Sequence, residues 1–219
     1  HKKEKSAVFA AGCSPYKIIL LFIIGSLLGD ITETIFCRIT AGYWMSRSSL
    51  VWGPFSVVWG LAIALVTVLL YRYKDKPASW LFVVGTLLGG AYEYLCSVCT
   101  EVVFGAVFWD YSHIPFNLGG RINLLYCFFW GFAAVAWFKL LYPPISNLIE
   151  RLPRRFGTVL TWLLCLFMVA DMAVSALALI RYNTRLEGEP PRNQLEVYLD
   201  EHYDDARMQA VYPKAVHIQ

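Results

Sequence analysis

The sequence predicts an all-α fold: a polytopic membrane helix bundle of about five transmembrane helices with an internal parallel two-helix repeat. Three observations support this prediction. The 219 residues are 58% hydrophobic and 16% charged, with a mean hydropathy of +0.50, whereas soluble domains are about half apolar and about a quarter charged. The apolar residues form long runs rather than a helical or strand periodicity. Two of these runs share a pattern of glycines and a glutamate.

Five apolar runs are each close to the roughly 20 residues that a helix needs to cross the hydrocarbon core. They cover residues 17–38, 51–71, 79–103, 122–141 and 157–180. We therefore expect a transmembrane domain over residues 17–181, between an N-terminal segment (1–16) and an acidic tail (182–219). We expect no cleavable signal peptide, because the first run is long enough to remain in the bilayer.

Basic residues alternate between the connecting segments, and this predicts the orientation of the chain in the cell membrane. They cluster in 1–16, 72–78 and 142–156, whereas the other two connections contain little beyond Arg47 and Arg121. Because Lys and Arg accumulate in cytoplasmic loops, we expect a cytoplasmic N-terminus. Five spans then place the acidic tail on the extracytoplasmic side.

The segment 142–156 has the pattern of a short amphipathic helix. Its apolar side contains Ile145, Leu148, Ile149 and Leu152, opposite acidic and basic residues. One interpretation is a basic helix that lies on anionic lipid. The other is a docking element for a cytoplasmic partner such as an ATPase.

An internal repeat relates GSLLGDITETIFC (25–37) to GTLLGGAYEYLCS (85–97), with both glycines and the glutamates Glu33 and Glu93 in matching positions. Each copy is followed by a Trp-Gly pair, at 59–60 and at 130–131. Since each unit holds two spans, both copies insert in the same orientation, which predicts a pseudo-twofold axis along the membrane normal. The glycines allow close helix approach, and we expect the two copies to pack against each other through them.

Charged groups inside a bilayer cost several kcal/mol unless they are paired or hydrated, so they indicate function. Four carboxylates lie roughly 20–24 Å along a helix from the cytoplasmic ends of their spans: Asp30, Glu33, Glu93 and Asp171. We expect them in the outer half of the membrane, where the first and third connecting segments cover them.

These groups predict an outward-facing pocket that binds a substrate or an ion. The candidate residues are Asp30, Glu33, Arg47, Glu93, Tyr94, Trp109, Asp110, Tyr111, Asn117 and Arg121. We expect Arg47 and Arg121 to pair with Glu33 and Glu93, because a guanidinium matches a carboxylate bidentately. Arg121 would then bind an anionic group of a solute, and a glutamate would bind a cationic group, a proton or a metal cation.

Each of these residues also has a structural interpretation. The ion pairs would merely hold the two repeats together. Asp110 would form a turn before Pro115, and Asn117 would cap the fourth span. Trp109 and Tyr111 would belong to an aromatic belt at the membrane interface.

Several classes of function find no support in the sequence. It contains no Walker A loop, HExxH, GxSxG or Gly-rich dinucleotide loop, so we expect no catalytic motif, no cofactor and no nucleic-acid partner. Cys96 and Cys99 have CxxC spacing, but no second pair completes a zinc site, so we expect no bound metal. A disulfide between Cys37 and Cys96 or Cys99 stays open.

The WDYS (109–112), PFN (115–117), GRI (120–122) and Trp-Gly (130–131) elements resemble a known family of membrane proteins, "Putative ABC-transporter type IV", also called CmpB-like. The resemblance extends to GSLLGDITETIF, to Arg47 with the following Trp-Gly-Pro, to Glu93, and to LDEHYDDARMQAVYP in the tail. It implies a transport permease. Asp30 and Asn123 depart from the family pattern and would alter the charge preference of the pocket.

The sequence therefore favours a transport protein, or the membrane subunit of a transporter, for a small charged or zwitterionic solute or a cation. One alternative is a membrane-embedded enzyme that acts on lipid or on an extracytoplasmic substrate, with paired carboxylates in acid–base roles. Another is a non-catalytic scaffold or sensor. The substrate, the coupling ion and assembly into a homo-oligomer stay open.

Overall fold

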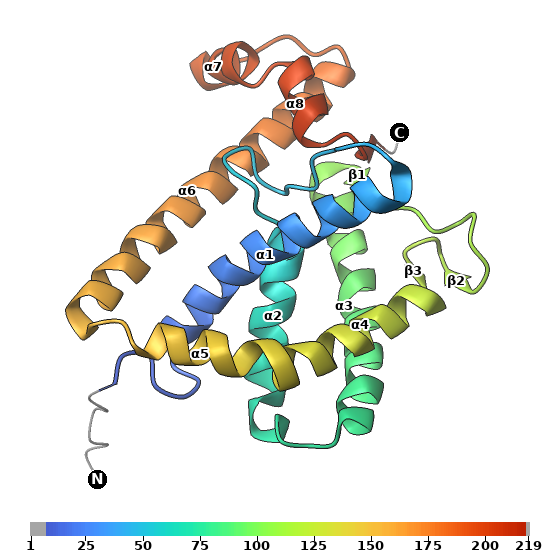
Figure 1. The fold of residues 1–219 in the computed structure, drawn as a ribbon. Helices are drawn as coiled ribbons and strands as arrows, with labels where there is room; N and C mark the ends of the chain where they lie inside the picture. The colour runs from blue at the N-terminus through green and yellow to red at the C-terminus, as the bar shows by residue number, and fades with distance from the viewer. Residues whose placement is uncertain (1–7, 218–219) are drawn as a thin grey trace.

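The chain folds into a helical bundle, which confirms the predicted all-α class (Figure 1). This computed structural model describes residues 8–217, and the strands within that range are two residues long. The elements in chain order are α1 (Pro15–Ala41), α2 (Val57–Leu70), the 3₁₀ turn η1 (Tyr71–Tyr73), α3 (Ala78–Phe104), β1 (Ala106–Val107), β2 (Asn117–Leu118), β3 (Ile122–Asn123), α4 (Leu124–Ala136), the π-helix η2 (Trp137–Leu141), α5 (Tyr142–Glu150), α6 (Arg154–Leu186), α7 (Gln194–His202), α8 (Asp205–Val211) and β4 (Val216–His217).

Four helices in the described range are long and apolar enough to cross a membrane: α1, α3, α6 and the continuous helix Leu124–Glu150. The apolar helix Val57–Tyr73 is shorter. It begins at Val57 rather than at residue 51, because the preceding segment forms a loop. That loop contains Gly53 with a φ of +82°, followed by Pro54. Ser56 then caps α2 by accepting a hydrogen bond from the Trp59 N–H at 3.5 Å.

The predicted fourth connecting segment is largely helical, because the helix does not end near residue 141. It passes through the π-helix η2 into α5 and ends at Glu150. Pro143 follows directly on the π-helix, whose altered hydrogen bonding accommodates a residue without an N–H inside a continuous helix. Only residues 151–153 connect α5 to α6.

A buried lysine ties the start of α1 to the end of this long helix. The Lys17 side chain is 1% exposed, and its Nζ donates to Ser146 Oγ and Glu150 Oε1, both at 2.6 Å. The charge is therefore paired as well as buried, as a low-dielectric interior requires.

The sequence repeat is also a repeat of packing. A Cβ added at Gly29 of α1 would lie 2.2 Å from the Cβ of Trp59 on α2, and one at Gly89 of α3 would lie 2.2 Å from the Cβ of Trp130 on α4. The glycines thus allow close approach within each helix pair. The expectation that they join the two copies to each other is wrong.

Contact between the two copies comes instead from aromatic residues on the second helix of each. The rings of Trp59 and Trp130 are 5.0 Å apart between centroids. Close by, the Tyr92 hydroxyl of α3 donates to the carbonyl oxygen of Val58 on α2 at 2.5 Å. Figure 1 shows α2 and α3 running antiparallel at the centre, with α1 and the α4–α5 helix crossing them.

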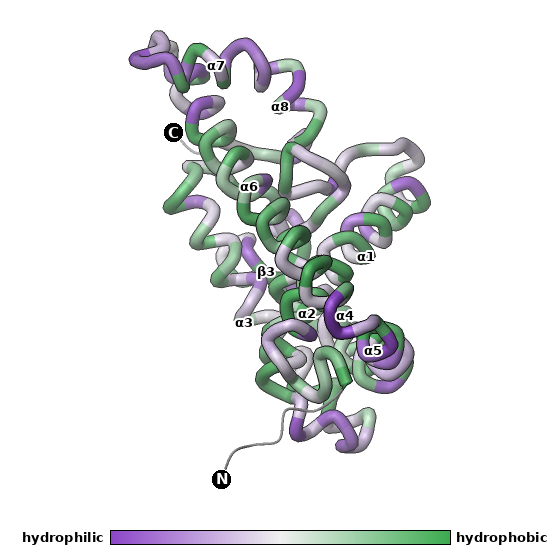
Figure 2. Tube along the Cα trace, turned by 90° about the vertical axis from the view of Figure 1, so that its left-hand side faces the viewer, coloured by the Kyte–Doolittle hydropathy of each residue, from purple (hydrophilic) through white to green (hydrophobic). Residues whose placement is uncertain are grey.

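The bundle has two polar ends separated by an apolar middle (Figure 2). One end carries the α2–α3 and α5–α6 connections. The other carries the α1–α2 loop and the tail with α7 and α8, and the β2–β3 segment lies at the side, next to α3 and the start of α4 (Figure 1). The tail folds back onto the bundle, because β4 pairs with β1 and a buried cluster that includes Tyr203, Met208 and Tyr212 packs against α6.

Candidate functional site

A cavity of about 360 Å³ lies beneath the tail. Its lining comes from α1, the α1–α2 loop, the first turns of α2, the second half of α3, α6, the segment after β1, and residues 211–214 of the tail. Three of the predicted site residues line it: Glu33, Arg47 and Trp109. The candidate site is therefore built from segments that are distant in sequence, as the prediction requires, but with a different set of residues.

The one expected ion pair that forms is Glu33 with Arg47. Arg47 Nε donates to Glu33 Oε2 at 3.3 Å, and both side chains are partly exposed to the cavity. Arg47 reaches the carboxylate because the helix α1 ends at Gly42, whose φ is +83°, and the chain then turns back along the helix.

Arg121 does not pair with Glu33 or Glu93. Its guanidinium donates to the carboxylate of Glu101 and to Ser97 Oγ, the latter at 2.9 Å, and lies over the Tyr94 ring at 5.8 Å. Glu101 is two turns beyond Glu93 on α3 and therefore nearer to the loop that carries Arg121. Its position at i+8 from Glu93 is the sequence signal that could have identified it.

Glu93 is instead satisfied by neutral donors. The Tyr111 hydroxyl donates to its Oε1 at 2.7 Å, and Trp130 Nε1 donates to its Oε2 at 2.8 Å. Burial, followed by the nearby carboxylates of Glu93 and Glu33, raises the pKa of Tyr111, so this hydroxyl stays a neutral donor. Glu93 thus joins α3 to α4 and to the loop.

Two of the predicted residues stabilise the loop between α3 and α4. Asp110 accepts hydrogen bonds from the backbone and the hydroxyl of Ser112 at 2.9 and 3.0 Å, which lower the pKa of Asp110. Asn117 donates to the Ile114 carbonyl at 2.8 Å and accepts from the Gly120 N–H at 3.1 Å. The expected cap of the fourth span by Asn117 is wrong, since Asn123 caps α4 by accepting from the Leu125 N–H.

The remaining carboxylates of the predicted cluster do not line the cavity. Asp171 is fully buried and anchors the α1–α2 loop, since its Oδ1 accepts from the Trp52 N–H at 3.1 Å and from Ser175 Oγ at 3.3 Å. Asp30 is 4% exposed. Within residues 8–217, neither Asp30 Oδ1 nor Asp171 Oδ2 has a hydrogen-bond partner.

The cysteines are all free thiols. A disulfide from Cys37 to Cys96 or Cys99, which the sequence leaves open, is not formed. Cys96 and Cys99 instead line the cavity from α3. They provide two native reporters of access to it.

The tail is the part of the site that the sequence does not reveal. Tyr212 donates to the Ser49 carbonyl at 2.5 Å, and Trp52 Nε1 donates to the Tyr203 hydroxyl at 2.9 Å. Burial raises the pKa of Tyr212. These bonds hold residues 211–214 over the cavity as a lid. The acidic composition of the tail gives no sign of this fold.

An arginine–aspartate cluster fixes the lid to the end of α6. Arg181, 3% exposed, donates through Nε and Nη2 to the two oxygens of Asp200 at 2.7 and 2.9 Å, and Arg185 adds a third bond at 2.9 Å. Hydrogen bonds from Arg181 and then Arg185 lower the pKa of Asp200. The ionised form of Asp200 is therefore the form that holds the tail.

We expect the docking of the tail to weaken in acid. A carboxyl group with a lowered folded-state pKa stabilises the folded form above its unfolded-state value, and this contribution is lost as the pH falls through the folded-state value. Pepsin should cleave apolar sites of α7 and α8 once the tail undocks. At pH 5 we expect wild type to be cleaved more slowly than Asp200→Asn, and below about pH 4 this difference should disappear. A wild-type profile equal to that of Asp200→Asn would contradict this role.

The comparisons with known proteins identify the membrane part of the chain. The family model described as "Putative ABC-transporter type IV" matches residues 20–176, which exclude the folded tail. No curated protein and no solved structure matches the chain. The matched region covers α1 to α5 and most of α6, including Glu33, Glu93 and the loop with Arg121, and is well over half of the sequence. The chain therefore belongs to the "Putative ABC-transporter type IV" family of membrane proteins, which supports a role in membrane transport.

Proposed function

We propose that this protein is the membrane subunit of a transporter, or a small carrier, and that its solute passes between the two repeats. The observation that carries this proposal is a pair of cavities on opposite sides of one contact between the repeats. The first is the cavity beneath the tail. The second, of about 340 Å³, is lined by α1, α2, α3, α4 and η2.

The order of the lining residues supports a common path for the two cavities. On α2, Val58 and Leu61 line the first cavity, whereas Trp59 and the residues from Ala62 onward that face a cavity line the second. On the antiparallel α3, Cys96 and later residues line the first, whereas Tyr92 and earlier ones line the second. The hydrogen bond from Tyr92 to Val58 joins a residue of the second lining to one of the first. Trp59, which follows Val58, and Trp130 contact each other in the lining of the second cavity. We call this group of four residues the constriction.

The ion pair of Glu33 with Arg47 favours a solute with a charged or zwitterionic group. Each residue of such a pair at the cavity wall can release its partner and bind a group of opposite charge on the solute. The pair belongs to the first cavity alone, because the lining of the second is apolar apart from Thr32 and Tyr92.

We further propose that the end with the tail is extracytoplasmic. Basic residues gather at the opposite end, on the α2–α3 and α5–α6 connections: Arg72, Lys74, Lys76, Arg151, Arg154 and Arg155. By the positive-inside rule that end faces the cytoplasm. An ATPase partner would then dock on residues 142–156, where α5 ends and the chain turns into α6.

The constriction gives a test that requires no knowledge of the solute. A cysteine introduced by Leu88→Cys in the second cavity should react with a charged, membrane-impermeant thiol reagent from one side of sealed proteoliposomes only. Adding Tyr92→Ala removes the phenol ring and its bond to Val58, so the same cysteine should react from both sides, with at least a tenfold gain on the formerly closed side. The labelled peptide is quantified by mass spectrometry.

The control is Tyr73→Ala, which changes a tyrosine of η1 that is exposed and lies outside both cavities. It should leave the one-sided pattern intact. A scaffold or sensor without a path through it would keep the one-sided pattern in the Tyr92→Ala background as well, and that result would overturn the proposal.

A further inference from the structure

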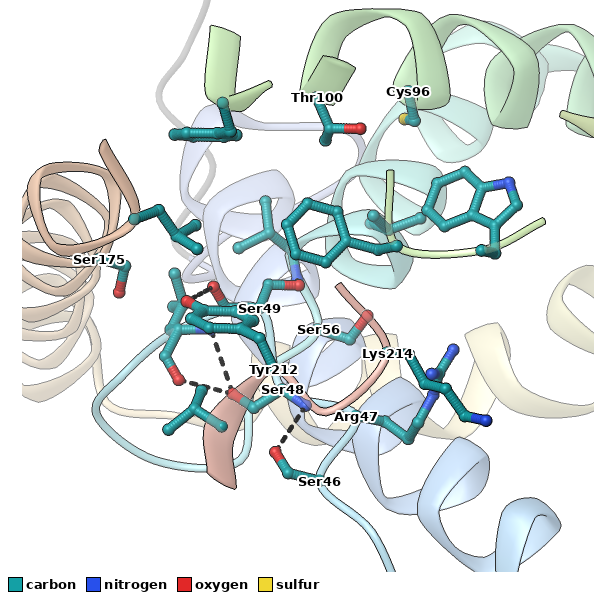
Figure 3. A pocket seen from close by; sticks show the side chains of 18 of the residues that line it. Ser46, Arg47, Ser48, Ser49, Ser56, Cys96, Thr100, Ser175, Tyr212 and Lys214 are labelled. Atoms are coloured by element: carbon teal, nitrogen blue, oxygen red, sulfur yellow. Dashed lines mark hydrogen bonds between the residues drawn. The ribbon is translucent and has the colours of Figure 1, made fainter. Parts of the chain in front are cut away.

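The cavity beneath the tail contains two cations that face the same space from different parts of the chain. Arg47 comes from the α1–α2 loop and Lys214 from the segment after α8 (Figure 3). We infer that this cavity binds an amphipathic anion, with its acidic group on Arg47 and Lys214 and its apolar body against α2, α3 and α6. This inference rests on the proposed function and names the class of its solute.

Several hydroxyl groups around the cavity hold its walls together. The single hydroxyl proton of Ser48 has the Leu50 and Gly53 carbonyls within reach, at 2.8 and 2.9 Å from Oγ, and Ser49 Oγ accepts from the Val57 N–H at 3.1 Å. Ser56 caps α2, as described above. These serines hold the loop and the start of α2. Ser49 and Ser56 act there as acceptors, so their hydroxyl protons can still be donated to an anionic group.

Ser175 and Thr100 use their hydroxyl protons within the protein. Ser175 Oγ accepts from the Val51 N–H at 2.9 Å and donates to Asp171, and Thr100 donates to the Ser97 carbonyl at 3.0 Å.

The two cations, in contrast, have donors to spare. Within residues 8–217, Lys214 makes no hydrogen bond or ion pair, and Arg47 uses only Nε, toward Glu33. Arg47 and Lys214 outnumber the one acid of the described lining, Glu33, so the net charge of the charged side chains is positive. Figure 3 shows both cations on the same side of the cavity, away from Ser175. An anionic group is thus the chemistry that this end recognises.

The rest of the wall is apolar. It includes Leu61 of α2, Phe104 of α3, Phe108, and Met172 and Leu179 of α6. Apolar surface stabilises a bound ligand in proportion to the area removed from water. A small inorganic anion would use the cations but leave this wall unfilled, whereas an alkyl phosphate, sulfonate or carboxylate would use both. The anion could come from solution or, as an anionic lipid, from the bilayer.

The test uses the full chain in nanodiscs of phosphatidylcholine and follows alkylation of the native Cys96 and Cys99. Octyl phosphate should protect both thiols, whereas inorganic phosphate and octanol should protect at least tenfold more weakly. Lys214→Gln and Arg47→Gln should each weaken protection by octyl phosphate about tenfold, since each removes a charged partner. Lys76→Gln, at the opposite end of the molecule, is the matched control and should not change it.

A second arm separates the two sources of the anion. Protection without any added probe in phosphatidylglycerol nanodiscs would identify the bilayer as the source, and protection by octyl phosphate alone would identify solution. Either result supports the inference.

The inference would be overturned if octanol or inorganic phosphate protected the two thiols as well as octyl phosphate does. It would also be overturned if Lys214→Gln left the protection by octyl phosphate unchanged. Lys214 is exposed and unpaired, so its variant is expected to fold. Failure here leaves the two-sided labelling test of the constriction unaffected, so the two proposals can fail separately.

Discussion

Replacing Asp200 by alanine is expected to detach the tail from the membrane helices and to open the cavity beneath it. Asp200 accepts three hydrogen bonds from Arg181 and Arg185, and Arg181 is almost fully buried. Loss of one partner of a buried ion pair costs about 3–5 kcal/mol, because the other charge is left uncompensated. We expect the lower end of this range, since Arg181 keeps its bonds to Thr184 and to the Glu189 carbonyl.

The measurement is the rate at which Cys96 and Cys99 react with a charged thiol reagent, together with proteolysis between α6 and α7. Both rates should rise at least tenfold in Asp200→Ala. The matched control is Asp205→Ala, because Asp205 also pairs with Arg185, at 2.9 Å, but is 54% exposed. Exposed pairs contribute about 1 kcal/mol or less. Equal effects of the two variants would refute a special role of the buried cluster.

The second large effect is expected at the paired glycines of the repeat. An alanine at Gly29 or Gly89 would place its Cβ 2.2 Å from the Cβ of Trp59 or Trp130. The Cβ of a tryptophan is bonded directly to its Cα, so rotation of the side chain cannot move it away. The helices must therefore separate, and we expect a loss of at least about 1–3 kcal/mol in each variant.

Thermal unfolding in detergent micelles measures this loss. Gly29→Ala and Gly89→Ala should lower the midpoint by similar amounts, because the two sites are equivalent in the repeat. Ala91→Val, which enlarges an exposed residue on the same helix as Gly89, serves as the control and should change it little. Stability equal to that of the control in both glycine variants would show that the helix pairs tolerate the added carbon.

Much of the fold follows from the sequence, because span length and small residues are local signals. The apolar runs predict the helices, and the Gly and Trp-Gly positions predict that two helix pairs are related. The limits of α2 and α5 are less predictable. A serine-rich loop stands where the first turns of α2 are predicted. The π-helix η2 lets the preceding helix continue through Pro143 into α5. Both depend on hydrogen bonds that no periodicity reveals.

The site is predictable only in part, because the partner of each arginine depends on which carboxylate its side chain can reach in the folded chain. Glu33 and Arg47 are 14 residues apart across a tight turn, and they meet as predicted. Arg121 had several acids within reach on α3, and it pairs with the nearest to its loop, Glu101. The sequence does not identify Lys214 as a site residue, because its position depends on how the acidic tail folds back onto the bundle.

The meeting of Trp59 with Trp130 has a mechanical consequence. These residues occupy the same position in each repeat and contact each other, so a twofold axis relating the two hairpins would pass between their rings. A rocking motion of one hairpin against the other would pivot at this point. The cavity beneath the tail and the second cavity would then widen alternately, one opening while the other narrows.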